Sequence, residues 1–251
     1  MKKIIIAASM LAATFAANAQ DPSLAPTRLY KPVAGNVTAE IGFLTGGVSA
    51  NPTRLQDGPF GELTPQLKFR YFLQDQIALR VGFGYTKTAT TNKYYEPTPG
   101  SGEGFERDAS SRFGLNAGIE KHFTGTGRLS TYAGADILFQ KVGASTKWEN
   151  SDGNGFVDGQ TRQTKGFSVN GGEASVGFGL RAVAGADYYF VEKVYLGAEM
   201  GWGFIASKNG KTKDESTMGG VTADPIETKS TGGSFELTPS LNLGLRLGFI
   251  F

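Results

Sequence analysis

The 251-residue chain contains no cysteine and only one histidine, His122. These absences exclude disulfide scaffolds, cysteine nucleophiles and metal centres built from several histidines. Charged residues make up only 19% of the chain, and beyond the N-terminus no apolar run approaches the ~20 residues of a membrane helix. Glycine is the residue in excess, with 36 copies, which is about twice its usual share and favours turns and strands over helices.

The N-terminus has the pattern of an export signal. Two lysines precede an apolar run, and Ala17-Asn18-Ala19 then supplies the small-x-small pattern of a secretory cleavage site. We therefore expect residues 1–19 to be a signal peptide cut before Gln20, because the alternative, an N-terminal membrane helix, needs a longer run. Removing two of the 25 basic residues leaves 23, equal to the 23 acidic residues, so no excess of positive charge indicates nucleic acid as a partner.

Apolar residues recur at every second position in eight segments. The clearest lies at the C-terminus, where apolar residues at 241, 243, 245, 247, 249 and 251 enclose small or polar ones. The other segments with this alternation are 37–43, 67–73, 77–85, 113–119, 133–139, 176–190 and 194–204. Because a period of two is typical of a β-strand with two different faces, the sequence predicts an all-β protein of eight strands.

The segments between these strands alternate in length. Short connections lie at 74–76, 124–128 and 191–193, and long polar ones lie near 46–63, 86–111, 141–172 and 206–233. Antiparallel neighbours joined in this order place all tight turns at one rim, and all long loops with any hairpin extensions at the other. Both ends of the chain then lie at the rim of the tight turns.

The two faces of the predicted strands distinguish two kinds of barrel. A lipocalin-like barrel would enclose the apolar face around a ligand and expose the other face to water. That other face, however, is rich in glycine and carries isolated charges, which fits the lumen of a narrow eight-stranded barrel, where small side chains must offset large ones. The apolar face carries one charge, Lys121, close to a tight turn, so we expect this face to contact lipid.

Backbone groups in lipid must all be paired, so the first and eighth strands are expected to close the sheet. We therefore predict an eight-stranded antiparallel up-and-down transmembrane β-barrel over residues 36–251. Residues 20–35 precede it as an N-terminal extension.

Over residues 36–251 the chain resembles small eight-stranded outer-membrane β-barrels of the OmpX and OmpA-transmembrane-domain type. Its most specific feature is a C-terminal pattern similar to the β-signal read by the barrel assembly machinery. The residues of this pattern are Asn242, Gly244, Leu247, Phe249 and Phe251. The resemblance implies the outer membrane of a Gram-negative bacterium, with lipid and lipopolysaccharide around the barrel and both termini and the extension in the periplasm. The cleavage site is similar to those of Bacteroidota.

Nearly balanced charges occupy the predicted lumen face. Their residues are Glu40, Lys68, Arg70, Arg80, Arg112, Glu120, Asp136, Arg181, Asp187, Glu199 and Arg246. Buried charges are tolerated when they are paired, so we expect a bridged plug. Residues at similar heights predict one polar layer, formed by Glu40, Arg80, Glu120, Asp187 and Arg246. The alternative is a thin charged passage for ions or a small solute.

Catalysis is not expected from this sequence. Outer-membrane enzymes mostly use a histidine as general base near the outer rim, whereas His122 lies two residues before a short turn at the opposite rim, between Lys121 and Phe123 and with no serine beside it. We therefore expect no catalytic residues and no cofactor. Function is placed in the exposed loops, as adhesion, contact with an extracellular or outer-membrane protein, or envelope integrity. The alternative function is a narrow channel or carrier for ions or a small solute.

Two loop motifs predict hairpins. Residues 150–158 match the first nine positions of a calcium-binding loop, but Thr161 stands where a bidentate glutamate is needed. The Asp-Gly and Asn-Gly pairs in this stretch favour a hairpin tip, with calcium as the alternative, so no metal ligand is predicted. Asn209-Gly210 predicts a second hairpin turn in the last long connection.

Overall fold

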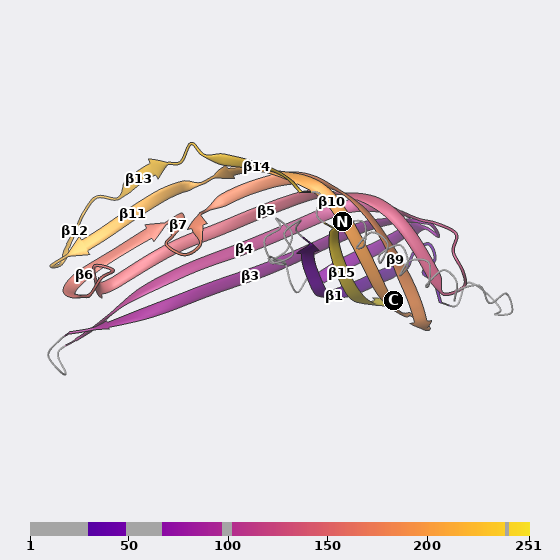
Figure 1. Ribbon diagram of the computed structural model, residues 1–251, viewed down its shortest axis with the longest axis horizontal. Coiled ribbons are helices and arrows are strands. Elements are labelled where there is room, and N and C mark those ends of the chain that lie inside the picture. The colour runs from indigo at the N-terminus through magenta and orange to yellow at the C-terminus, as the bar shows by residue number, and fades with distance from the viewer. Residues whose placement is uncertain (1–29, 49–66, 97–101, 239–240) are drawn as a thin grey trace.

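The computed structural model describes residues 30–48, 67–96, 102–238 and 241–251 (Figure 1). The predicted signal peptide, residues 20–29 of the predicted extension and most of the first long connection lie outside these residues. In the described part of the chain, no helix has the length and apolarity needed to cross a bilayer.

Eight antiparallel strands form a closed ring. In order around the ring they are β1 (Val37–Val48), β2 (Leu67–Gln74), β3 (Ile77–Tyr95), β4 (Glu103–His122), β5 (Leu129–Ser151), β9 (Ser175–Val191), β10 (Val194–Asn209) and β15 (Leu241–Ile250). Each strand pairs with its neighbours in this order, and β15 returns to pair with β1, with Ala39 opposite Phe249. The predicted eight-stranded antiparallel barrel and its closure are confirmed.

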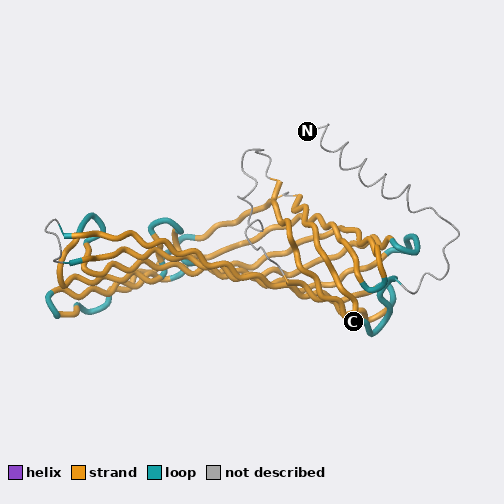
Figure 2. The backbone as a smooth tube through the Cα atoms, turned by 90° about the horizontal axis from the view of Figure 1, so that it is seen from below, coloured by secondary structure: helices purple, strands orange, loops and turns teal. Residues whose placement is uncertain are grey.

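Beyond the ring, several strands continue into a long curved sheet, which we call the projecting sheet. It consists of residues 86–95, 103–112 and 141–151 of β3, β4 and β5, together with β6 (Phe156–Lys165), β11 (Lys211–Met218), β12 (Val221–Thr222) and β13 (Ile226–Lys229). β14 (Gly233–Thr238) pairs with β10 next to β15. Figure 1 shows the projecting sheet as an arch that reaches away from the ring, and Figure 2 shows the two parts at opposite ends of the molecule.

The projecting sheet corrects the prediction that the long connections are mainly loops. β3 and β4 pair continuously from Ile77 opposite Lys121 out to Tyr95 opposite Glu103. The outer half of β3 is rich in threonine and tyrosine, which favour strands. Both faces of this half are polar, so it has no hydrophobic period by which a strand is recognised in a sequence.

The predicted turn at Asn209-Gly210 is wrong, because the chain passes straight from β10 into β11 at this point. The N–H of Gly210 donates to the carbonyl of Ala174 in the neighbouring segment at 2.7 Å. The turn lies instead at Gly219-Gly220, between Met218 and its partner in β12. Both glycines have positive φ, +56° and +81°, as a two-residue type I′ hairpin requires.

The predicted hairpin over residues 150–158 is confirmed, since this segment joins β5 to β6. Oδ1 of Asp152 accepts hydrogen bonds from the backbone N–H groups of Asn154 at 2.8 Å and Gly155 at 2.9 Å, and these bonds lower the pKa of Asp152. Among the described residues, no group of three or more His, Cys, Asp or Glu side chains is arranged to hold a metal ion.

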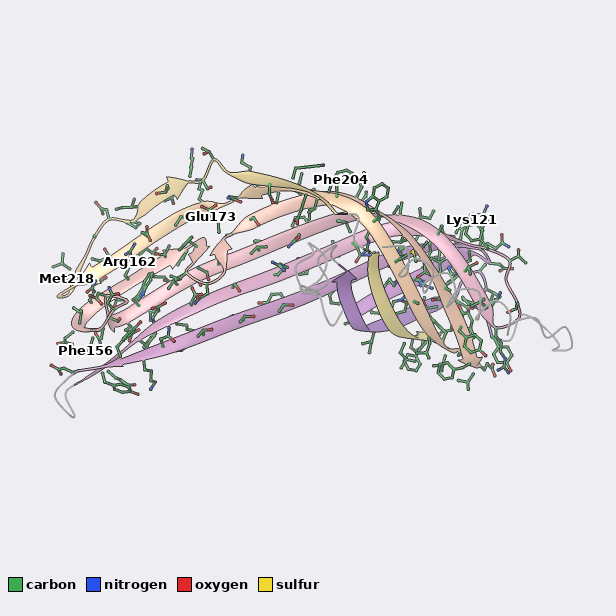
Figure 3. The ribbon with its side chains drawn as sticks, in the orientation of Figure 1. Lys121, Phe156, Arg162, Glu173, Phe204 and Met218 are labelled. Carbon is green, nitrogen blue, oxygen red and sulfur yellow. The ribbon has the colours of Figure 1, made fainter. Side chains whose placement is uncertain are left out.

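The apolar face of the ring points outward. Leu79, Ile137 and Trp202 expose 46%, 63% and 58% of their surface, and Lys121 lies on the same outer face near the tight turns (Figure 3). The charged residues of the opposite face are enclosed, with Arg70 only 1% exposed. The prediction that the apolar side lies outside and the glycine-rich side lines the lumen is confirmed.

Glycines in the lumen make room for large side chains, as the sequence predicts. A Cβ atom at Gly185 would overlap the ring and hydroxyl of Tyr132, and one at Gly248 would overlap the ring of Tyr195. Both tyrosines are almost completely buried. In the narrow lumen, each of these large side chains therefore lies opposite a glycine on the neighbouring strand.

The described part of the N-terminal extension folds against the rim of the tight turns. Tyr30 packs against the buried cluster of Tyr189, Tyr195 and Ile250, and the guanidinium carbon of Arg128 lies 4.7 Å from the centre of the Tyr30 ring. This end of the lumen is thus covered by side chains from the extension and from three ring strands.

Gly248→Ala is expected to lower the free energy of unfolding by about 1–3 kcal/mol, because the added methyl group overlaps the Tyr195 ring. Urea unfolding in detergent micelles, followed by tryptophan fluorescence and by the gel mobility of the folded barrel, measures this change. Gly127→Ala is the control, since nothing lies within 4 Å of the added carbon. Equal stability of the two variants would contradict the packing.

Candidate functional site

Ion pairs connect the eight ring strands inside the lumen, and we call this set the lumen network. Its five cations are Lys68, Arg70, Arg80, Arg181 and Arg246, and its five anions are Glu40, Glu120, Asp136, Asp187 and Glu199. Each of the eight ring strands contributes at least one of them. This is possible because every second residue of each strand points to the axis.

Arg70 is the centre of the lumen network. Its Nε lies 2.7 Å from Oε1 of Glu40 and 2.8 Å from Oε1 of Glu120, and its Nη1 donates to Oδ2 of Asp187 at 2.5 Å. Its partners come from β1, β4 and β9, while Arg70 itself lies on β2. One buried guanidinium therefore joins strands from several sides of the barrel.

Arg246 links the two strands that close the barrel. Its Nη1 lies 2.9 Å from Oε2 of Glu40 on β1, and also 2.9 Å from Oε2 of Glu199 on β10. Its Nη2 lies 3.1 Å from Oδ1 of Asp187. The structure thus brings Glu40 and Arg246 together, as expected for one polar layer, and adds Glu199 to their contacts.

Arg80 extends the network across the other half of the ring. It lies 2.9 Å from Glu120, 3.0 Å from Asp136 and 2.8 Å from Glu199. Asp136 also accepts two hydrogen bonds from Arg181, at 3.1 Å and 2.5 Å. All ten groups of the network have an oppositely charged partner, and the numbers of positive and negative groups are equal.

Two tyrosines complete the lumen network. The hydroxyl of Tyr195 donates to Oε1 of Glu40 at 2.8 Å, and that of Tyr132 donates to Oε2 of Glu199 at 2.7 Å. The guanidinium of Arg70 lies over the Tyr132 ring, 4.7 Å from its centre. Tyr132 was missed from the sequence because the predicted strand begins one residue too late, although the alternation extends back to it.

Arg112 lies apart from the other predicted lumen charges. The structure places it at the base of the projecting sheet, opposite Thr86 of β3, where it lines a cavity together with Asp108 and Ser110. Its inward direction is as predicted, but it is not a member of the lumen network, because the strands continue beyond the ring. The other ten predicted lumen charges are all members of the lumen network.

His122 contacts a serine that is not adjacent to it in the sequence. Its Nδ1 lies 2.9 Å from Oγ of Ser130 on β5, and its Nε2 lies 2.9 Å from Oε1 of Glu120. These residue types are those of a hydrolase triad, but all three side chains are buried, and Glu120 is already paired with Arg70 and Arg80. A nucleophile must reach its substrate, and the side chain of Ser130 is enclosed in the lumen.

A short hairpin lies on the face of the projecting sheet that continues the lumen face of the ring. It comprises β7 (Phe167–Ser168) and β8 (Gly172–Glu173) and is held by Asp108 of β4. The carboxylate accepts hydrogen bonds from Ser168 Oγ at 2.8 Å and from the backbone N–H groups of Val169 and Asn170 at 2.9 Å and 3.0 Å. Thr146 adds a fourth bond at 2.6 Å. Burial opposes ionisation of Asp108, but these bonds outweigh it and lower its pKa.

The architecture has a counterpart in known proteins. A family model described as the putative OmpA-OmpF-like porin family matches residues 62–246. The chain belongs to this family. This porin-family protein is therefore an outer-membrane β-barrel, and its family is one of porins rather than of enzymes.

Three solved structures are similar to this porin-family chain. The N-terminal β-barrel domain of Pseudomonas aeruginosa OprF has 17% identity and a TM-score of 0.36, covering 88% of this chain and 100% of that one. A major outer membrane protein from Thermus thermophilus has 13% identity and a TM-score of 0.45, with coverage of 86% and 98%. Ail, the attachment invasion locus protein of Yersinia pestis, has 14% identity and a TM-score of 0.38, with coverage of 87% and 99%. No curated protein matches the chain.

The C-terminal strand of this porin-family barrel carries the predicted assembly pattern. Phe249 and Phe251 are exposed on the outer face, and Leu247 pairs with Ile41 of β1. The backbones of Asn242 and Gly244 pair with β1 as well, while the side chain of Asn242 lies outside the described part of the structure. Recognition of this strand by the assembly machinery stays a prediction.

Arg70→Met is expected to destabilise the porin-family barrel by about 3–5 kcal/mol, because three buried carboxylates lose their shared cation. Unfolding in detergent or lipid gives the difference. Lys121→Met is the matched control, since Lys121 is exposed on the outer face beside a tight turn, where a charge matters little. A decrease in the free energy of unfolding no larger than in the control would show that the lumen network does not stabilise the barrel.

Docking of the β7–β8 hairpin is expected to fail as pH falls. The pKa of Asp108 is lower in the folded state than in the unfolded chain, so its contribution is complete above the usual aspartate pKa and is lost as pH drops through the lowered value. The protection factors of the Val169 and Asn170 amides, which are their exchange rates corrected for the intrinsic pH dependence of exchange, should therefore fall at low pH. Asp108→Asn should show fast exchange already at neutral pH, and slow exchange in that variant would contradict the role of the carboxylate.

Proposed function

We propose that this outer-membrane barrel is a closed anchor that does not conduct, and that it acts through the projecting sheet on the outside of the cell. The lumen network carries this proposal, because a ring of ten paired charges from all eight strands occupies the cross-section through which a solute would pass. A wide aqueous lumen needs more strands, since the interior of an eight-stranded barrel is just wide enough for side chains or one small ligand.

The rim of the tight turns also supports a closed lumen. At this rim, Tyr30 covers the buried tyrosine cluster. A solute would have to displace side chains both here and in the lumen network, and this favours an anchor over the alternative of a narrow channel or carrier.

The projecting sheet has the properties of a contact surface. Its strands are mostly polar on both faces and carry exposed ion pairs, such as Lys93 with Glu103 and Lys165 with Glu215. Outer-membrane barrels place tight turns in the periplasm and long connections outside, which puts this sheet on the cell surface and both termini in the periplasm. The roles that follow are adhesion, contact with an extracellular or outer-membrane protein, or support of envelope integrity.

The same orientation assigns the remaining partners. The exposed belt of aliphatic and aromatic side chains contacts membrane lipid, and lipopolysaccharide surrounds its outer part. The C-terminal strand with Phe249 and Phe251 exposed is the segment offered to the barrel assembly machinery. A catalytic role is not proposed, because the only histidine is buried with its serine and carboxylate neighbours.

Planar-bilayer conductance of the refolded protein tests the closed lumen. We expect currents close to those of the bare membrane, while a general porin in the same bilayers conducts. Stable open steps well above the baseline would contradict the proposal and favour the channel.

Epitope insertion tests the proposed orientation. An epitope inserted after Gly219 should be stained on intact cells, whereas the same epitope after Gly127 should be stained only after permeabilisation. The reverse pattern would overturn the proposed orientation.

A further inference from the structure

A polar cavity lies on the face of the projecting sheet that continues the lumen face, between the β7–β8 hairpin and the mouth of the barrel. Its volume is about 320 Å³, at the small end of the roughly 300–1,000 Å³ of ligand pockets. The wall from β3 presents Thr86, Thr88 and Thr90, and the wall from β4 presents Ser110 and Arg112. A space of this size accommodates one small molecule rather than a peptide or a lipid chain.

The lining is dominated by hydroxyl groups in a regular row. Thr86, Thr88 and Thr90 alternate along one strand, so their side chains follow one another at about 7 Å on the same face. Each hydroxyl both donates and accepts hydrogen bonds. A row of such groups complements a ligand that itself carries several hydroxyls, since each partner can take either role.

Charge in the cavity favours a neutral ligand. Asp108 and Arg112 are the charged residues among those that line it, and they carry opposite signs. The carboxylate of Asp108 already accepts four hydrogen bonds from Thr146 and the hairpin. Its role is therefore to fix the hairpin that forms one wall of the cavity. Val142 supplies an apolar surface on the β5 side, and a sugar ring has both hydroxyls and an apolar C–H face.

The position of the β7–β8 hairpin indicates that the cavity is a defined site rather than a gap in the packing. Asn170 and Gly171 at its tip form one wall, and Gly171 lies so close to Ser110 that a side chain there would overlap it. The hairpin contributes nothing to the ring, because among the described strands β7 and β8 pair only with each other. Its fixed position therefore encloses this space above the barrel.

We propose that this cavity binds a single neutral sugar ring, held by the threonine and serine hydroxyls of β3 and β4. The inference deepens the proposed function, because it rests on the projecting sheet being the contact surface, and it names the chemical class of that contact. Recognition of one ring in a small open site corresponds to weak affinity, with a Kd of about 1–10 mM.

Titration of the refolded full chain with D-glucose, D-galactose and methyl glycosides, followed by saturation-transfer NMR, tests the inference. Thr88→Val keeps the volume but removes one hydroxyl, so the Kd is expected to rise about fivefold to tenfold. Thr91→Val is the matched control, because this neighbouring threonine of β3 lies on the opposite face, and its Kd should equal that of the unchanged chain. Gel mobility confirms that both variants are folded.

Three results would overturn the inference. They are no binding of any neutral sugar at about 50 mM, binding that is unchanged by Thr88→Val, and at least tenfold preference for glucuronate or glucosamine over glucose. Conductance keeps the two proposals separate. A non-conducting barrel that binds no sugar refutes the sugar site alone, whereas a conducting barrel whose sugar binding is lost in Thr88→Val refutes the closed anchor alone.

Discussion

Ten charged side chains share one narrow lumen, and their mutual pairing is the constraint on which the rest of the molecule depends. A buried charge without a partner costs several kcal/mol, and the partners of each charge come from different strands. Arg70 alone contacts carboxylates from β1, β4 and β9. The pairs can therefore all form only when the eight strands are in register at once, so that closure of the ring and neutralisation of its interior are the same event.

This constraint explains the division of the chain into a charge-filled barrel and a largely polar sheet. The ring uses its inward positions for paired charges, tyrosines and the glycines that make room for them, while its outward positions are apolar and suit lipid. Beyond the ring no lipid has to be contacted and no lumen has to be filled, so both faces of the strands become polar. The hairpin and the cavity beside Asp108 are found in that part, where loss of one contact does not threaten closure.

The sequence shows the ring more clearly than the projecting sheet for the same reason. In β15, alternation is visible because one face meets lipid and the other the lumen; in the outer half of β3 both faces are polar, and the strand has no such pattern. The sequence therefore does not show that β4 continues past Arg112 into the projecting sheet. Contacts across strands, such as His122 with Ser130, depend on register and are not visible among sequence neighbours. The central role of Arg70 depends likewise on several strands meeting.

A double-mutant cycle between Glu40 and Arg246, which join the first and last strands of the ring, tests the central claim most directly. The free energies of unfolding in lipid are compared for Glu40→Gln, Arg246→Met and the double variant. If their pairing closes the barrel, the two losses should be non-additive, with a coupling of about 1–3 kcal/mol. Additivity within about 0.5 kcal/mol would contradict the account, because it would show that the charges of the lumen do not hold the closing strands together.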